Sequence, residues 1–334
     1  PLQLERASGE LDTQTWMRVL DQAAELRVLQ THFSGGEPLL RPDLETLIQH
    51  AGACGLYTNL ITSGIGLSAA RAGALAKAGL DHAQLSLQDT EPNSADRFAG
   101  SKNTLAKKLT VAAWLREAGL PLTINAVMHR GNLDHLEAMI ETALQLDAGR
   151  LEVAHVQYYG WALRNRASLM PTRAQIDRAT EIVTAARVRL SGKLVIDYVV
   201  PDYYATRPKA CMGGWGRRFL NVDPNGRVLP CHAAPTITEL HFDTVREKSL
   251  GDIWRNSAAF NQFRGTDWML EPCQSCERRE IDWGGCRCQA LALAGDAAAT
   301  DPACGLSPHH AMMLETAVRE AAAPAPEFIY RRMR

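Results

Sequence analysis

The chain has 334 residues, of which 46% are hydrophobic and 22% are charged. This is ordinary for a globular chain with a core, and the length suits one large α/β domain with a smaller one. A net charge of −1 argues against a nucleic acid partner. No apolar run reaches the roughly 18 residues of a membrane span and no secretory signal is visible, so we predict a cytoplasmic protein without membrane contact.

The first 200 residues alternate between strand and helix patterns. Strands are predicted at 28–33, 56–62, 82–87, 122–128, 151–155 and 194–200. Helices are predicted at 11–26, with Asp12 or Thr13 as its cap, and at 42–53, 68–78, 104–118, 133–146 and 173–190. Strands separated by helices of about 10 to 15 residues indicate βαβ units and a parallel sheet.

Parallel sheets bind ligands at the carboxyl ends of their strands. Unusual polar and glycine-rich segments follow these strands, namely Ser34-Gly35-Gly36-Glu37, 62–64, 86–89, Asn125 and 157–160. Glycine lets the backbone approach a ligand closely, and carbonyls with a carboxylate suit an ammonium group. A plain turn between strand and helix remains the alternative for Gly35, Gly36 and Glu37.

The pattern changes after about residue 204, where cysteine, glycine and tryptophan become frequent. We predict an α/β domain at 1–204, a cysteine-rich domain at 205–305 and a C-terminal helix with a tail at 306–334. Within the later part, helices are predicted at 250–263 and 308–321.

Seven of the eight cysteines lie between Cys211 and Cys304, whereas Cys54 stands alone and is predicted to be a small buried hydrophobic residue. The seven follow the order Cys211, Gly226-x4-Cys231, Cys273-x2-Cys276-x5-Asp282-x3-Cys286-x1-Cys288 and Cys304. Thiolates suit zinc and iron–sulfur clusters alike, and spacing alone leaves both open. Seven thiolates do not fill two four-ligand sites, and Asp282 in the middle of the array offers the eighth ligand.

The parallel sheet, the Gly35-Gly36-Glu37-Pro38 turn and the cysteine array together resemble the radical S-adenosylmethionine (SAM) family with a SPASM extension. That extension holds two auxiliary clusters, and its pattern has a cysteine where this chain has Asp282. The segment 157–166, Asp282 and the tail Phe328-Ile329-Tyr330-Arg331 are similar to the PqqA peptide cyclases of pyrroloquinoline quinone biosynthesis. The resemblance implies a partial (β/α)6 TIM-like barrel followed by a SPASM domain.

The resemblance also implies the ligand sets and the nuclearity options, 4Fe–4S or 2Fe–2S. Cys211, Cys231 and Cys286 match the first auxiliary site, and the added Cys288 completes its count. Cys273, Cys276, Asp282 and Cys304 match the second site. The family's SAM-cleaving 4Fe–4S cluster sits on a Cys-x3-Cys-x2-Cys loop that this chain lacks, and we expect that loop upstream of Pro1.

In that family SAM lies across the strand tips, with Gly35, Gly36 and Glu37 at its ammonium in this numbering. Ser86 and Asn125 would hold ribose or carboxylate, and Gln157 would flank adenine. The family uses a 5′-deoxyadenosyl radical to join a glutamate and a tyrosine of the peptide PqqA by a carbon–carbon bond. Asp202 and Tyr203 are weak candidates for the proton acceptor.

The implied partners are PqqA, the peptide chaperone PqqD and an electron donor such as flavodoxin. Three other hypotheses stay open at this stage. The chain is another SPASM peptide maturase that forms thioethers or matures a sulfatase, a relative that modifies a nucleotide or RNA, or a zinc-bound scaffold without chemistry.

Overall fold

The computed structural model describes residues 9–330, so the predicted cluster loop upstream of Pro1 and the tail residues 331–334 lie outside the described residues. The described chain forms two compact units. One contains Asp12–Val156 and Pro171–Val199, and we call it the sheet unit. The other contains residues 9–11, Gln157–Met170 and 200–330, and we call it the cysteine unit.

The sheet unit confirms the predicted α/β class. Its six strands pair in chain order, and all of the pairs are parallel. They are β1 (Gln30–Phe33), β2 (Tyr57–Thr62), β3 (His82–Ser86), β4 (Leu122–Met128), β5 (Arg150–His155) and β6 (Val195–Val199). Each predicted strand is present, with its ends shifted by no more than two residues.

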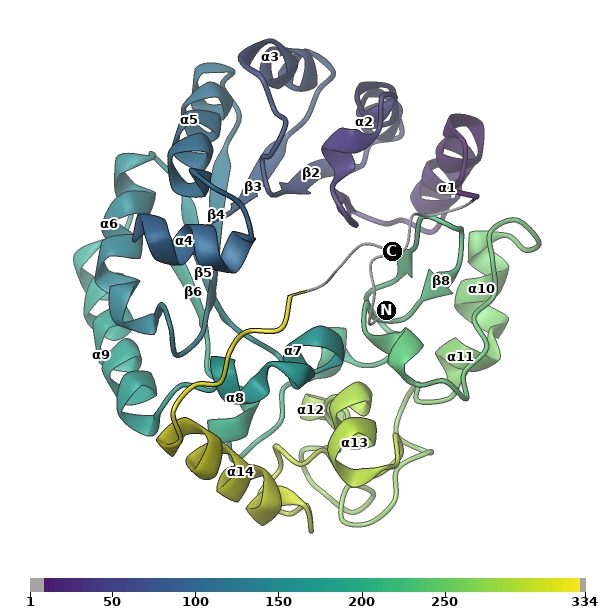
Figure 1. Ribbon diagram of the computed structural model, residues 1–334. Coiled ribbons are helices and arrows are strands. Elements are labelled where there is room, and N and C mark those ends of the chain that lie inside the picture. Colours follow the sequence, from purple (N-terminus) through teal and green to yellow (C-terminus); the bar gives the residue numbers. More distant parts are fainter. Residues whose placement is uncertain (1–8, 331–334) are drawn as a thin grey trace. The chain divides into compact units, whose positions relative to one another are not determined.

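Helices connect these strands and follow one another along the outer side of the sheet (Figure 1). They are α1 (Thr13–Glu25), α2 (Leu44–Ala53), α3 (Ala69–Lys77), α5 (Thr104–Glu117), α6 (Leu136–Gln145) and α9 (Arg173–Arg189). The predicted cap of α1 is confirmed, since the Asp12 side chain accepts a hydrogen bond from the Thr15 amide at 2.8 Å. Ile124, Leu151 and Val153 have no exposed area, so the core lies between the central strands and these helices.

Helix α4 (Pro92–Ala99) is an addition that the sequence reasoning missed. Its signals are local: Pro92 begins the first turn, and the Glu91 carboxylate accepts from the amides of Asn93 and Ser94. Gly100 ends it in the left-handed conformation, with φ of 64°. These capping signals were readable, but the helix has only 8 residues and buries only Ala95.

The cysteine unit consists of short elements. Its helices are α7 (Gly160–Arg164), α8 (Arg166–Leu169), α10 (Leu250–Asn256), α11 (Ala258–Asn261), α12 (Arg279–Asp282), α13 (Arg287–Ala294) and α14 (His310–Ala322). Strands β7 (Asn221–Val222) and β8 (Val228–Leu229) form an antiparallel pair. The single helix predicted at 250–263 is wrong, because extended backbone at Ser257 (φ −60°, ψ 129°) divides it into α10 and α11.

The segment Gln157–Met170 belongs to the cysteine unit, although the predicted boundary assigned it to the 1–204 domain. Tertiary contacts explain the difference. Arg166 on α8 forms a two-point ion pair with Glu320 on α14 at 2.8 and 2.7 Å, and it donates to the Tyr203 hydroxyl at 3.0 Å. Asn165 accepts from the Ile329 amide at 2.7 Å. No helix among residues 9–330 combines the length and the apolar character that crossing a bilayer requires.

Candidate metal and cofactor sites

Four cysteine side chains form a ring of neighbouring thiols in the cysteine unit. Cys211 interacts with Cys231 and Cys286, and Cys288 interacts with the same two partners. Interaction with Cys231, and then with Cys286, raises the pKa of Cys211 and of Cys288, and the same interactions lower the pKa of Cys231 and of Cys286. The four side chains come from three separate stretches of the chain and lie near one another, and four thiolates are a ligand set that suits a zinc ion or an iron–sulfur cluster.

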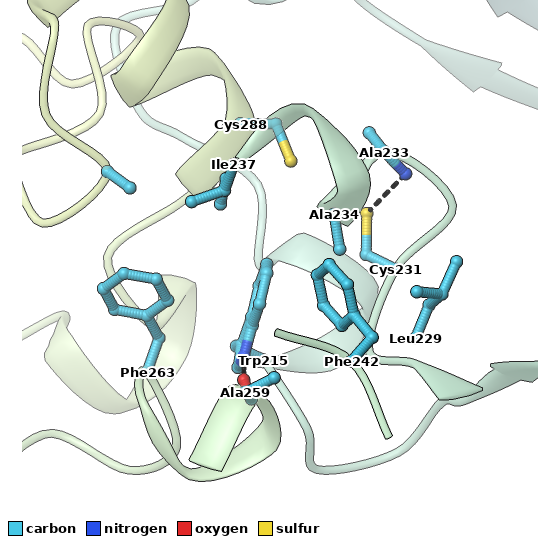
Figure 2. Packing of buried hydrophobic residues seen from close by; sticks show 11 residues of the cluster. Trp215, Leu229, Cys231, Ala233, Ala234, Ile237, Phe242, Ala259, Phe263 and Cys288 are labelled. Atoms are coloured by element: carbon cyan, nitrogen blue, oxygen red, sulfur yellow. Dashed lines mark hydrogen bonds between the residues drawn. The ribbon is translucent and has the colours of Figure 1, made fainter. Parts of the chain in front are cut away.

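The ring rests on a packed aromatic core. Figure 2 shows Cys231 and Cys288 beside Trp215, Phe242 and Phe263, all of which are buried. The Ala233 amide donates to the Cys231 sulfur at 3.3 Å, and such bonds to sulfur tune a bound cluster. None of the eight cysteines forms a disulfide, so all four sulfurs of the ring are available as ligands.

The second predicted ligand set lines one small pocket. Cys273, Cys276, Asp282 and Cys304 all contribute to its wall. Asp282 is 9% exposed, its Oδ1 accepts from the Gly284 amide at 3.2 Å, and its Oδ2 lies 3.5 Å from Arg278 Nε. Three thiols and one carboxylate around one pocket are the ligand types of a cluster with a single oxygen ligand.

A buried arginine, Arg287, lies in the electrostatic reach of both ligand sets. It stands between Cys286 and Cys288 in sequence, is 1% exposed, and interacts with Cys286, Cys273 and Cys211. Its guanidinium donates to the carbonyls of Ala297 and Ala299 at 2.9 Å and to that of Gly284, and it lies over the Trp268 ring. Within residues 9–330 no carboxylate forms an ion pair with it, and its Nε has no hydrogen-bond partner. The sequence reasoning missed this residue.

The nearest carboxylate in electrostatic terms is Asp301, which is also buried. It accepts from the Cys286 amide at 2.6 Å, from Gln289 at 2.8 Å and from the Ala303 amide at 2.9 Å. Burial raises the pKa of Asp301 to about 6. Asp301 therefore holds the backbone of a ring cysteine in place, a role that no sequence motif indicated.

Tyr159 is a second residue that the sequence reasoning did not single out near the thiol ring. Its side chain is 36% exposed, yet burial around the hydroxyl raises the pKa to about 12, and all four ring cysteines add to the shift. The segment 157–160 therefore borders the ring. The sequence contained a hint, since this segment carries part of the family resemblance.

The Gly35-Gly36-Glu37 turn follows β1 in the sheet unit. A Cβ at Gly35 or Gly36 would meet nothing within 4 Å, and Gly35 has φ of +124°, which favours glycine. The Glu37 carboxylate accepts from the Thr62 hydroxyl at 2.5 Å and from the Ser63 amide at 2.9 Å. The turn thus offers open backbone to a ligand, while the carboxylate holds the turn against the end of β2.

Ser86, Asn125 and Glu152 lie side by side across β3, β4 and β5. The Glu152 carboxylate accepts from Asn125 and from Gln84, both at 2.8 Å. Glu152 was not predicted, although a charged residue between the buried Leu151 and Val153 was a readable signal. These three polar side chains on neighbouring parallel strands suit hydrogen bonds to the polar groups of a ligand bound at the sheet.

Lys108 on α5 secures this end of the sheet. It is 2% exposed, and its ammonium donates to the Ser86 carbonyl at 2.5 Å. Burial lowers the pKa of Lys108 to about 8, and the charge of Glu37 opposes that shift. A buried lysine therefore links the Glu37 turn to Ser86.

The remaining predicted site residues lie in the cysteine unit. Gln157 is exposed. Asp202 pairs with Lys209 at 2.7 Å. Tyr203 is 1% exposed and packs edge-on against Tyr158, so its hydroxyl is not open to a peptide side chain. The burial argues against Tyr203 as the proton acceptor.

The prediction for Cys54 is wrong in part. The residue packs against a hydrophobic cluster, but it is only half buried, and its thiol donates to Asp21 Oδ1 at 3.4 Å. The sequence around Cys54 is apolar and helical, so it gave no sign of the polar contact with Asp21 on helix α1.

Two family models match separate stretches of the chain. The family model described as the Radical SAM superfamily matches residues 3–143, and the SPASM model, described as an iron–sulfur cluster-binding domain, matches residues 211–277. The two matches define the class: the chain is a radical SAM enzyme with an iron–sulfur cluster-binding domain. SAM and iron–sulfur clusters are therefore its cofactors, and the thiol ring, the cysteine-lined cavity and the open glycine turn fit them.

Curated relatives narrow the class. A PqqA peptide cyclase of Rhodopseudomonas palustris is 62% identical over 332 residues, which are 99% of this chain and 88% of that protein. A PqqA peptide cyclase of Bradyrhizobium diazoefficiens is 60% identical over 99% of this chain and 87% of that protein. The chain belongs to the PqqA peptide cyclase family.

Solved structures show the same fold. Streptococcus suis SuiB bound to its precursor peptide SuiA has a TM-score of 0.73 at 20% identity, over 90% of this chain and 71% of that one. The enzyme anSMEcpe with bound AdoMet has a TM-score of 0.64 at 15% identity, over 95% and 88%. At these identities the likeness supports the fold alone.

Proposed function

We propose that this protein joins a glutamate and a tyrosine side chain of the peptide PqqA by a carbon–carbon bond, early in pyrroloquinoline quinone biosynthesis. The observation that carries the proposal is the 62% identity to a PqqA peptide cyclase over 99% of the chain. The other SPASM maturases and the zinc-bound scaffold are weaker alternatives, because the two relatives named above, at 62% and 60% identity, are PqqA peptide cyclases.

The proposal assigns two auxiliary clusters to the cysteine unit. Cys211, Cys231, Cys286 and Cys288 would hold the first, since their side chains are neighbours in the fold. Cys273, Cys276, Asp282 and Cys304 would hold the second, since they line one cavity. A third cluster, which cleaves SAM, would sit on cysteines upstream of Pro1.

In the sheet unit, the open backbone at Gly35 and Gly36 would receive the SAM ammonium group. Glu37 would act mainly by holding this turn through Thr62 and Ser63. Asn125 and Ser86 would face ribose or carboxylate, with Glu152 orienting the Asn125 amide. Gln157 would flank the adenine. When bound, SAM and its cluster supply the one-electron chemistry that activates an unreactive carbon.

A group of the protein would take the proton that the tyrosine ring releases on crosslinking. Asp202 remains a candidate, with Lys209 as its partner. PqqD would present the peptide, and a flavodoxin-type protein would donate electrons.

The test uses the full-length protein, reconstituted with iron and sulfide under anaerobic conditions. It is incubated with PqqA, PqqD, SAM and reduced flavodoxin, and PqqA is examined by tandem mass spectrometry. A loss of two hydrogens that maps to one glutamate and one tyrosine supports the proposal. An unchanged PqqA mass from protein with a full iron content would refute it, and a colourless protein that holds only zinc would support the scaffold.

A Glu37→Gln variant tests the turn. It weakens the bonds from Thr62 and Ser63, so SAM affinity should fall about tenfold or more, in line with hydrogen bonds to charged groups. The iron content should stay at the wild-type level, because Glu37 lies in the sheet unit and the auxiliary ligands do not.

A further inference from the structure

Three metal-binding side chains lie together on α1 and α2 of the sheet unit. Asp21 is on α1, His50 is in the last turn of α2, and Cys54 directly follows that helix. His50 Nε2 and Cys54 Sγ lie 2.7 and 3.4 Å from the same oxygen, Asp21 Oδ1. All three ligand atoms lie within 4.8 Å of one another.

The two helices that carry these side chains pack closely against each other. His50 and Cys54 are four residues apart and therefore share one helix face. Next to them, Leu20, Leu47 and Ala51 are at most 5% exposed and join α1 to α2. The two helices thus hold the three side chains at one place without the help of a flexible loop.

The ligand types suit zinc, which binds cysteine, histidine and aspartate in tetrahedral geometry. Its usual bond lengths separate neighbouring ligand atoms by about 3.3 to 3.6 Å. The sulfur–oxygen distance of 3.4 Å already agrees, and the 2.7 Å between His50 and Asp21 must lengthen by roughly 0.7 Å. His50 and Asp21 are 25% and 50% exposed, so both side chains have room to turn, and water can fill the fourth position.

We propose that Asp21, His50 and Cys54 form a zinc site that ties α1 to α2. Binding replaces the thiol proton of Cys54 by a zinc–sulfur bond and releases that proton to solvent, without any change of oxidation state. This site is separate from the proposed auxiliary ligands, because Cys54 is the cysteine that neither of those sets uses. The competing interpretation is a hydrogen-bonded surface cluster that never binds metal.

The test uses the iron–sulfur-loaded full-length protein, treated with zinc chloride and then freed of excess metal by gel filtration. The zinc and iron contents per chain are measured by elemental mass spectrometry. In parallel, alkylation of Cys54 by iodoacetamide is followed by peptide mass spectrometry. The variants are Cys54→Ser, His50→Gln and Asp21→Asn, with Glu25→Gln as the control, since Glu25 is an exposed acid on the same helix.

We expect wild type to retain about one more zinc per chain than Cys54→Ser, with unchanged iron. Zinc at ten times its dissociation constant should slow Cys54 alkylation about tenfold in wild type and Glu25→Gln. His50→Gln and Asp21→Asn should lose most of that protection. Equal zinc retention by wild type and Cys54→Ser, or equal protection of Cys54 in His50→Gln, would overturn the proposal.

Discussion

Neutralising Arg287 should lower the reduction potentials of the auxiliary clusters. Arg287 is buried and carries a positive charge at neutral pH. It interacts electrostatically with cysteines of both ligand sets. Reduction adds one negative charge to a cluster, and a nearby positive charge favours that state. Asp301, which has the largest charge interaction with Arg287, offsets part of this effect.

The magnitude follows from Coulomb's law. At an effective dielectric constant of about 20 and a separation of roughly 8 Å, two unit charges interact by about 2 kcal/mol. For a one-electron couple this corresponds to a shift of about 90 mV. Arg287→Gln should therefore lower the midpoint of the nearer cluster by up to about that amount. The glutamine amide can still donate to some of the Ala297, Ala299 and Gly284 carbonyls, so the fold should survive.

The assay is a potentiometric titration of the reconstituted protein, followed by electron paramagnetic resonance. Arg287→Lys is the matched control, since it keeps the charge but loses the planar fork of donors. Its midpoints should stay close to those of the wild type. A shift below about 20 mV in Arg287→Gln with full iron would refute the electrostatic argument. So would an equally large shift in Arg287→Lys, because lost packing would then be the cause.

Three further predictions concern single residues. Asp282→Ala removes the proposed oxygen ligand of the second cluster. Iron and sulfide content should therefore fall by up to one cluster per chain, while the spectrum of the thiol-ring cluster persists. An unchanged iron content would show that Asp282 is not a ligand. Glu320→Ala breaks the partly buried ion pair with Arg166 and should cost about 2 kcal/mol in denaturant unfolding, in line with hydrogen bonds to charged groups. The exposed Glu315→Ala on the same helix should cost less than about 0.5 kcal/mol. Burial lowers the pKa of His129 to about 4, so the folded state disfavours its charged form. Stability is therefore present above the unfolded pKa of about 6.5 and is lost as the pH falls toward 4, by up to about 3 kcal/mol. Unfolding measured at several pH values should show this loss in wild type and not in His129→Gln, and parallel pH profiles for the two proteins would contradict it.

The sequence by itself determined the alternation of strands and helices. Apolar residues at β4 and β5 repeat with a period of two, and caps such as Asp12 act within a few residues of themselves. Such signals are local, so they can be read without the fold. The class of enzyme was also readable, because the spacing of the cysteines and the Gly35-Gly36-Glu37 turn are linear patterns.

Contacts between distant residues were decided only by the tertiary structure. No spacing rule places Arg287 within reach of Cys273 and Cys211, or Tyr159 beside the thiol ring, because these contacts need the chain to fold back on itself. The segment 157–170 illustrates the same limit: its position after a strand assigned it to the sheet, whereas the Arg166–Glu320 pair holds it in the cysteine unit. Local patterns report the conformation of a few neighbouring residues, and the side chains that meet in a site are chosen by packing across the whole unit.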